Sequence, residues 1–294
     1  MQVTSNRIAI EVEDHGAPAG EPVLLIMGLG MQLVAWPDDF VASLVERGFR
    51  VIRFDNRDIG LSARLDHLGT PNLALDSVRF MLGLGVRSPY TLSDMADDSI
   101  GVMDALGIAK AHVCGASMGG MIAQRMAARH PARVKSLTLM MTSSGARRLP
   151  GPSMRVRSAM LSRPVDPKSP ESVIAHYVKL YKLIGSPAYP AADDDLQRRV
   201  GIAVRRSYRP RGTARQLVAI AADGDRTGLL GRIAVPTQII HGRHDSLVPV
   251  AAAHDLAAKI PGAKADVIDG MGHDLPRALW PRFVDGIVDA AARA

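Results

Sequence analysis

Residues 112–121, HVCGASMGGM, contain the stretch that decides the fold. Within it, Gly115, Ser117 and Gly119 form a G-x-S-x-G pattern directly after a short apolar run. The pattern also arises by chance, because serine and glycine are common in loops. Where it joins a strand to a helix, however, the serine hydroxyl is exposed on a strained turn, and the glycines leave room for the tight backbone. The neighbouring elements therefore decide whether Ser117 is a turn residue or a nucleophile.

Strands and helices alternate on both sides of this motif. Apolar or alternating runs predict strands at 7–13, 22–28, 50–55, 111–115, 134–140, 237–242 and 264–269. Helical patterns fill the intervals at 38–48, from the capping pair Ser93-Asp94 to about 106, at 118–130, at 250–260 and at 277–293. Such alternation favours a mostly parallel central sheet flanked by helices on both faces.

Residues 146–224 interrupt this alternation. They include helical pieces such as 171–183, and they contain 15 Lys and Arg against 6 Asp and Glu, in a chain whose net charge is +7. Because few aromatic residues accompany this charge to stack on bases, we interpret the segment as a solvated insertion and expect no nucleic-acid partner. The predicted organisation is a core of residues 1–145 and 225–294 that carries the insertion 146–224.

The bulk composition limits the class of protein. The chain has 294 residues and 47% hydrophobic content, which is enough for one large core. Its single cysteine, Cys114, lies in an expected strand and cannot form an internal disulfide. Neither a leader-like N-terminus nor a run of roughly 18 apolar residues is present. We therefore expect a cytoplasmic protein without metal, cofactor or membrane partner, and leave a homodimer open.

Three reactive side chains follow expected strands. Ser117 follows the strand at 111–115, Asp245 lies after the strand at 237–242, and His273 lies after the last strand. The carboxyl ends of parallel strands meet at one edge of the sheet, and the order Ser…Asp…His is one in which a catalytic triad occurs. In such a triad His273 would take the serine proton, and Asp245 would orient and stabilise the imidazole.

An acyl-transfer site also needs hydrogen-bond donors for the oxyanion. The Met118 N–H is expected at the N-terminus of the helix that follows Ser117. The loop 28–31, GLGM, offers a second donor, which we assign to Leu29, with a neighbouring residue as the alternative. Gly28 and Gly30 would permit the turn of this loop.

These motifs together resemble the α/β-hydrolases over the whole chain, and within them the aclacinomycin methylesterase group. The matching segments are MGLGMQLVAWP (27–37), VIRFDNRDIGLS (51–62), HVCGASMGG (112–120), VPTQIIHGRHDSLVP (235–249) and GMGHDLP (270–276). Two positions depart from many relatives, which carry His in place of Met27 and Gly in place of Asp58. The resemblance implies that residues 146–224 form a mostly helical lid over the site.

The substrate pocket is expected between this lid and the core. The substrate-binding candidates are Gly28, Trp36, Met160, Tyr177 and Tyr181. Packing remains the alternative for Trp36 and for the three lid residues, because a stripe of apolar side chains also forms a core. Arg57 and Asp58 are expected to tie down their loop.

Other side chains compete for the catalytic roles. Asp223 and Asp225 are rival acids, because some hydrolases take the carboxylate from an earlier strand end. His241 and His244 share the loop of Asp245, and Asp274 follows His273 too closely to orient it.

The favoured function is hydrolysis of small to medium carboxylic esters through an acyl-enzyme. A lactonase, a C–C bond hydrolase or a cofactor-free perhydrolase or haloperoxidase would use the same site. A ligand receptor that keeps the fold without turnover is the alternative from another class. Serine at position 117 disfavours the dehalogenase and epoxide-hydrolase branches, whose similar members have aspartate there.

Overall fold

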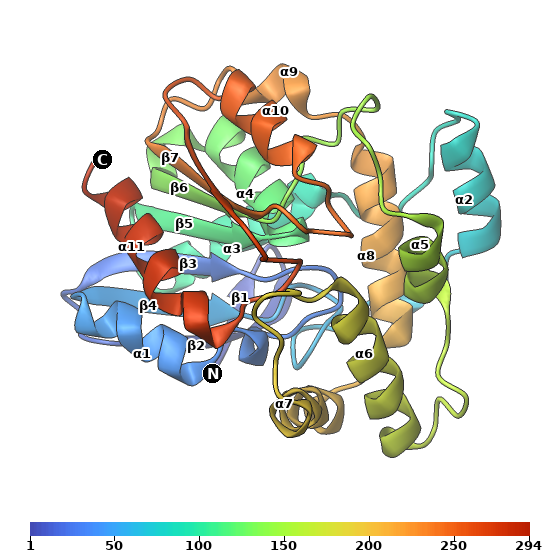
Figure 1. Cartoon of the computed structure of the whole chain (residues 1–294). Coiled ribbons are helices and arrows are strands. Elements are labelled where there is room, and N and C mark those ends of the chain that lie inside the picture. The colour runs from blue at the N-terminus through green and yellow to red at the C-terminus, as the bar shows by residue number, and fades with distance from the viewer.

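The computed structural model describes residues 1–294 and has one eight-stranded sheet at its centre (Figure 1). Its strands are β1 (Gln2–Ser5), β2 (Ile8–His15), β3 (Glu21–Ile26), β4 (Phe49–Phe54), β5 (Ala111–Ala116), β6 (Val134–Met140), β7 (Thr237–Gly242) and β8 (Lys264–Ile268). They lie in the order β1-β2-β4-β3-β5-β6-β7-β8. Strand β2 pairs antiparallel with both β1 and β4, and the remaining pairs are parallel. The predicted α/β-hydrolase sheet is thus confirmed.

Helices cover both faces of the sheet and extend beyond one end of it (Figure 1). They are α1 (Asp38–Glu46), α2 (Leu73–Met81), α3 (Leu92–Ala105), α4 (Met118–Arg129), α5 (Met154–Leu161), α6 (Pro170–Ile184), α7 (Asp193–Arg206), α8 (Pro210–Asp223), α9 (Thr227–Leu230), α10 (Ala251–Lys259) and α11 (Trp280–Ala291). Helices α1 and α11 pack on one face, and α3 and α4 on the other. No helix is long and apolar enough to cross a membrane.

The two-residue period of the strands divides the core into two layers. In β3, Leu24 and Ile26 belong to the cluster under α3 and α4, whereas Val23 and Leu25 belong to the cluster under α1 and α11. All four side chains are fully buried. A continuous apolar run therefore forms a strand here because both of its faces are covered.

Two local features differ from the expectation. The N-cap of α3 is Thr91, whose hydroxyl accepts from Asp94 N while the Asp94 carboxylate accepts from Thr91 N, so the cap lies two residues before Ser93. The sequence also did not predict β1 or α2. Strand β1 has only four residues and pairs only with β2 at the sheet edge, and no residue of α2 is buried.

Helices α5 to α8 lie between β6 and β7 in the chain, within residues 146–224. Helices α6 and α7 pack against each other, while α8 packs on α2 and α3. Two arginines anchor this segment to the loop after β4: Arg206 contacts Asp55 at 2.7 Å, and buried Arg215 contacts Asp58 at 2.7 Å. The division into core and lid stays a prediction, and the contacts of α8 join that helix to the core helices α2 and α3.

Candidate active site

Ser117 lies on a strained turn between β5 and α4. Its backbone has φ 53° and ψ −118°, a conformation that residues other than glycine seldom adopt. A Cβ on Gly119 would lie 2.0 Å from the Ile26 carbonyl oxygen, and one on Gly115 would lie 2.3 Å from the Gly119 oxygen. The G-x-S-x-G pattern is therefore explained by close backbone contacts, which hold the serine at the carboxyl end of the central strand.

His273 and Asp245 meet at the neighbouring strand ends. The His273 Nδ1 lies 2.7 Å from Asp245 Oδ2, and the other carboxylate oxygen accepts from the N–H groups of Leu247 and Val248 at 2.9 and 2.7 Å. The backbone N–H of His273 donates to the backbone oxygen of Ile184 at the end of α6. The structure thus brings together the acid and base expected from separate loops, and orients the imidazole through Nδ1.

The rival acids are occupied elsewhere. Asp223, at the end of α8, contacts Arg125 and Arg226, both at 2.6 Å, and its side chain is buried with that of Arg226. The Asp225 carboxylate accepts from Thr227 N at 2.8 Å, and this hydrogen bond lowers the pKa of Asp225. These contacts favour Asp245 over either residue as the partner of His273.

The other polar groups near the pair have separate partners. The Ser186 hydroxyl donates to Asp274, whose pKa is raised by burial. His241 donates through Nε2 to the Val248 oxygen at 2.7 Å, and burial lowers the pKa of its imidazole although Asp245 is nearby. Asp274 and His241 therefore each have a hydrogen-bond partner of their own, and we expect neither to replace Asp245 or His273.

The loop after β3 lies directly against the serine. A Cβ on Gly28 would lie 3.2 Å from the Ser117 Cβ and 3.7 Å from its Oγ. The N–H groups of Leu29 and Met118 donate no hydrogen bond within the chain. Two free backbone donors from two loops beside one hydroxyl are what an oxyanion hole requires.

A buried glutamine holds this loop in place. Gln216 Oε1, on α8, accepts from Gly30 N at 2.9 Å, and its Nε2 donates to the Arg57 oxygen at 2.9 Å. Gly30 has φ +68°, and a Cβ at this position would lie 2.9 Å from the side chain of Thr213, which is also on α8. Nothing in the sequence alone points to Gln216, because it is 186 residues from Gly30 along the chain.

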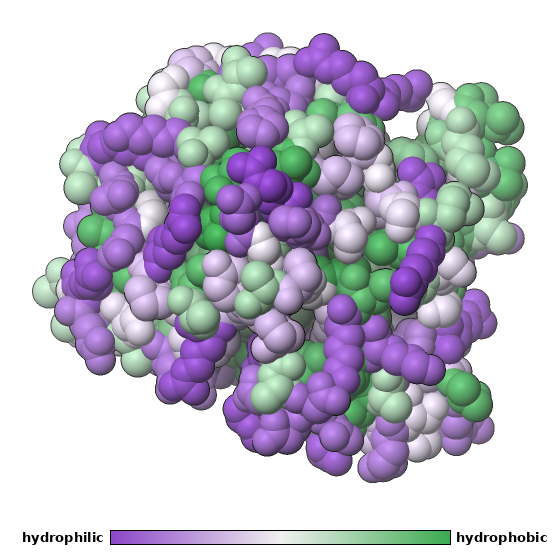
Figure 2. Space-filling model, in the orientation of Figure 1, coloured by the Kyte–Doolittle hydropathy of each residue, from purple (hydrophilic) through white to green (hydrophobic).

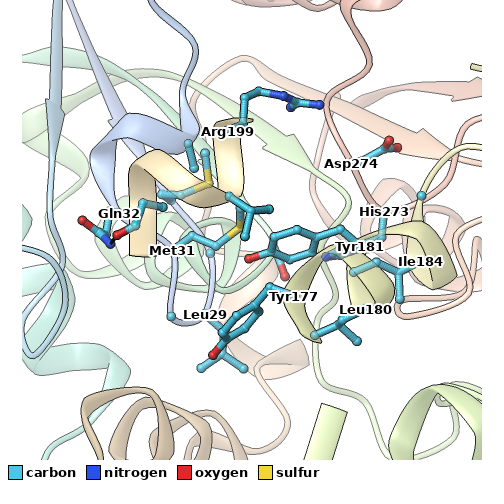
Figure 3. Close-up of a pocket in the computed structure, with 18 of the residues that line it drawn as sticks. Leu29, Met31, Gln32, Tyr177, Leu180, Tyr181, Ile184, Arg199, His273 and Asp274 are labelled. Atoms are coloured by element: carbon cyan, nitrogen blue, oxygen red, sulfur yellow. Dashed lines mark hydrogen bonds between the residues drawn. The ribbon is translucent and has the colours of Figure 1, made fainter. Parts of the chain in front are cut away.

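A large cavity opens beside Ser117. Its volume is about 1940 Å³, and Ser117 and His273 both line it, together with residues of α5 to α8 and of the β3 loop. Figure 3 shows Leu29, Tyr181 and His273 around the same space. Small-molecule pockets usually measure about 300–1,000 Å³, so this one has room for a bulky molecule.

Four of the five substrate-binding candidates line this cavity. Met160 comes from α5, Tyr177 and Tyr181 from α6, and Gly28 from the β3 loop. Burial raises the pKa of Tyr177 and raises that of Tyr181 to about 12, so both hydroxyls stay protonated near neutral pH. They offer the cavity an apolar ring with a neutral polar end.

Of the two roles left open for Trp36, the structure favours core packing over substrate binding. Its side chain is 0% exposed, stacks on Phe40 at a centroid distance of 5.6 Å, and does not line the cavity. Trp280 lines the cavity instead, edge-on to Phe40 at 6.2 Å. Trp36 and Phe40 are both buried in the core cluster on this face of the sheet, and Phe40 contacts both tryptophan rings.

The fold and this arrangement define an α/β-hydrolase. The model of the alpha/beta hydrolase fold family matches residues 21–276, and the chain belongs to this family. No group of three or more His, Cys, Asp or Glu side chains is placed to hold a metal ion.

The chain is similar to the aclacinomycin methylesterase group. It is 30% identical to rhodomycin D methylesterase DauP of Streptomyces sp. (strain C5) and 29% identical to rhodomycin D methylesterase DnrP of Streptomyces peucetius, in each case over 94% of this chain and 93% of the relative. Among solved structures, the enol-lactonase of Burkholderia xenovorans LB400 superposes with a TM-score of 0.75 at 24% identity, covering 99% of this chain and 100% of that one. This last likeness shows the fold alone.

Proposed function

We propose that this hydrolase cleaves carboxylic esters through an acyl-enzyme formed on Ser117. The observation that supports the proposal best is the meeting of three parts at one cavity: the strained serine turn, the Asp245–His273 pair and two free backbone donors. No one of these parts is specific alone. Together they supply a nucleophile, a base and an oxyanion site.

The geometry of the pair implies the direction of proton transfer. Because His273 Nδ1 faces Asp245, its Nε2 is the nitrogen that can accept the serine proton. Ser117 Oγ then bonds to the ester carbon, and the tetrahedral oxyanion accepts from the N–H groups of Leu29 and Met118. When this intermediate collapses, the imidazolium of His273 gives its proton to the leaving alcohol.

Deacylation repeats these steps with water. His273 takes a proton from the water, the hydroxide attacks the acyl carbon, and the acid is released as Ser117 Oγ regains its proton. Asp245 stabilises the imidazolium in both halves.

The cavity supports esters of bulky acids or alcohols over small ones. Its volume of about 1940 Å³ exceeds what a small ester would fill, and it is walled by Met160, Tyr177 and Tyr181. The two relatives named for rhodomycin D are methylesterases, which supports methyl esters as the first substrates to assay. A lactonase or a C–C hydrolase would use the same nucleophile, so lactones and diketones belong in the same panel.

Covalent labelling tests the proposal. A phosphonofluoridate should modify the wild-type protein once, at Ser117, and abolish turnover of p-nitrophenyl and methyl esters. Ser117→Ala should stay folded, resist labelling and lose roughly 10⁴-fold or more in kcat. A folded wild-type protein that resists the reagent and turns over no ester would favour a ligand receptor instead.

A further inference from the structure

Helix α2 and the turn after it expose an apolar surface. No residue of α2 is buried, and its last turn places Phe80, Met81 and Leu82 outward with 58%, 69% and 69% of each residue exposed. Leu84 follows them and is also exposed. Figure 2 shows this part of the molecule as a green, hydrophobic surface at the position of α2. Soluble proteins rarely expose so many adjacent large apolar side chains.

The segment around α5 continues this surface. A Cβ on Gly83, after α2, would lie 3.2 Å from a guanidinium nitrogen of Arg147, before α5. Met154 at the start of α5 is 77% exposed, and Leu161 at its end and Val165 in the loop after it are also exposed. We call the exposed side chains of residues 73–87 and 146–168 the α2–α5 surface.

This surface is also strongly basic. Residues 73–87 and 146–168 contain seven Arg and one Lys against two Asp, which is most of the excess charge of the chain. Of these arginines only Arg148 forms an ion pair, with Asp255. By contrast, Arg206 and Arg215, on neighbouring helices of the same segment, each form an ion pair with a buried aspartate. Unpaired cations beside exposed apolar groups match a partner that is anionic and offers an apolar layer.

The α2–α5 surface borders the mouth of the cavity. Asn72, Leu73 and Ala74 at the start of α2 line the cavity, as do Met160 and Leu161 at the end of α5. If an apolar layer lies against this surface, a molecule that moves out of the layer at this point reaches the mouth of the cavity.

We propose that the α2–α5 surface docks the protein on an anionic phospholipid bilayer. The apolar side chains of α2 would enter the boundary between head groups and acyl chains, while the arginines would contact lipid phosphates. A second copy of the chain fits less well, because a symmetric contact would bring two basic patches together. The expected absence of a membrane partner rested on the lack of a spanning segment, and peripheral docking needs none.

Sedimentation with vesicles tests the docking, and it requires no turnover. The full chain should bind vesicles containing phosphatidylglycerol and phosphatidylcholine more tightly than vesicles of phosphatidylcholine alone, and salt should weaken the binding. The triple variant Phe80→Ser, Met81→Ser and Leu82→Ser should lose binding at least tenfold. The double variant Arg147→Gln and Arg155→Gln should lose roughly tenfold or more, because each basic residue near an anionic surface contributes several-fold.

Matched controls separate the surface from total charge. Arg7→Gln with Arg232→Gln removes the same charge from exposed arginines outside the α2–α5 surface, and should change vesicle binding less than threefold. Circular dichroism should show all variants folded. Equal binding to both kinds of vesicle, or equal losses in the two arginine pairs, would overturn the proposal. So would a wild-type dimer that the triple variant converts to a monomer, since the surface would then join two copies.

Discussion

The turn that holds Ser117 and the helices that wall the cavity are positioned by different forces. At the turn, backbone atoms leave no space for a Cβ on Gly115 or Gly119, so the serine has one available position. The cavity walls depend on side chains instead, as where Tyr177 packs on Tyr181 at 5.9 Å. Backbone constraint fixes reacting atoms closely, whereas side-chain packing adjusts to substitution. Substitutions at the first region should therefore change rate, and those at the second should change substrate preference.

The largest effect is expected where the strand-end loops meet. Asp245→Asn should lower kcat by about 10²–10⁴-fold, because the amide cannot stabilise the imidazolium of His273 or select its tautomer. Steady-state ester hydrolysis measures this loss. Asp223→Asn is the matched control: it breaks the buried contacts with Arg125 and Arg226, so it should lower the free energy of unfolding and leave kcat within a few fold. The reverse pattern would make Asp223 the catalytic acid.

The next effect tests whether α8 positions the Leu29 N–H through the hydrogen bond between Gln216 and Gly30. Gln216→Leu removes the acceptor for Gly30 N and should lower kcat by roughly 10–100-fold with little change in KM, because the Leu29 N–H shifts from the oxyanion. Gln216→Glu keeps an acceptor and should recover part of the loss. If Gln216→Leu lowers only the free energy of unfolding, Gln216 is structural, and the two regions are independent.

A different kind of effect, on substrate preference, is expected at the cavity wall. Tyr177→Ala should shift relative kcat/KM among esters of different size by about 10–200-fold, while labelling of Ser117 stays intact. Trp36→Phe is the contrasting variant, because Trp36 packs under α1 and does not line the cavity. It should cost about 1–3 kcal/mol of unfolding free energy and leave the ester profile parallel to wild type. A parallel profile for Tyr177→Ala as well would place specificity elsewhere.

The smallest effect concerns pH and the buried imidazole beside the acid. Burial lowers the pKa of His241 below its ordinary value of 6.5, so below about pH 6.5 the unfolded chain binds a proton that the folded chain does not. The free energy of unfolding should therefore fall as the pH drops from 7.5 to 5.5. His241→Gln should lose less over this interval in urea titrations. Equal losses would assign the pH dependence to other groups, of which His112, with a pKa lowered in the same way, is the first to substitute.

Local patterns in the sequence were enough to predict the sheet, most helices and the three residues that follow strand ends. Ser117, Asp245 and His273 could be assigned because strand periodicity and turn glycines are read within about ten residues, and parallel strands then bring their carboxyl ends to one edge. The sequence alone does not distinguish Asp245 from the rival acids Asp223 and Asp225. The 2.7 Å contact of Asp245 with His273, together with the contacts of Asp223 with two arginines and of Asp225 with Thr227, favours Asp245 over the rivals.

Tertiary structure decided what depends on distant segments. Trp36 follows the β3 loop in the sequence, yet it packs inside the core beside Phe40, whereas Trp280 lines the cavity. Gln216 holds Gly30 across 186 residues, and no periodicity encodes such a contact. Helix α2 exposes apolar side chains because few elements pack on it, and the residues of α2 themselves do not determine how many elements do so. Sequence patterns thus predict most of the elements and the candidate reacting groups, whereas the cavity walls and the surfaces follow from which elements come to lie against one another.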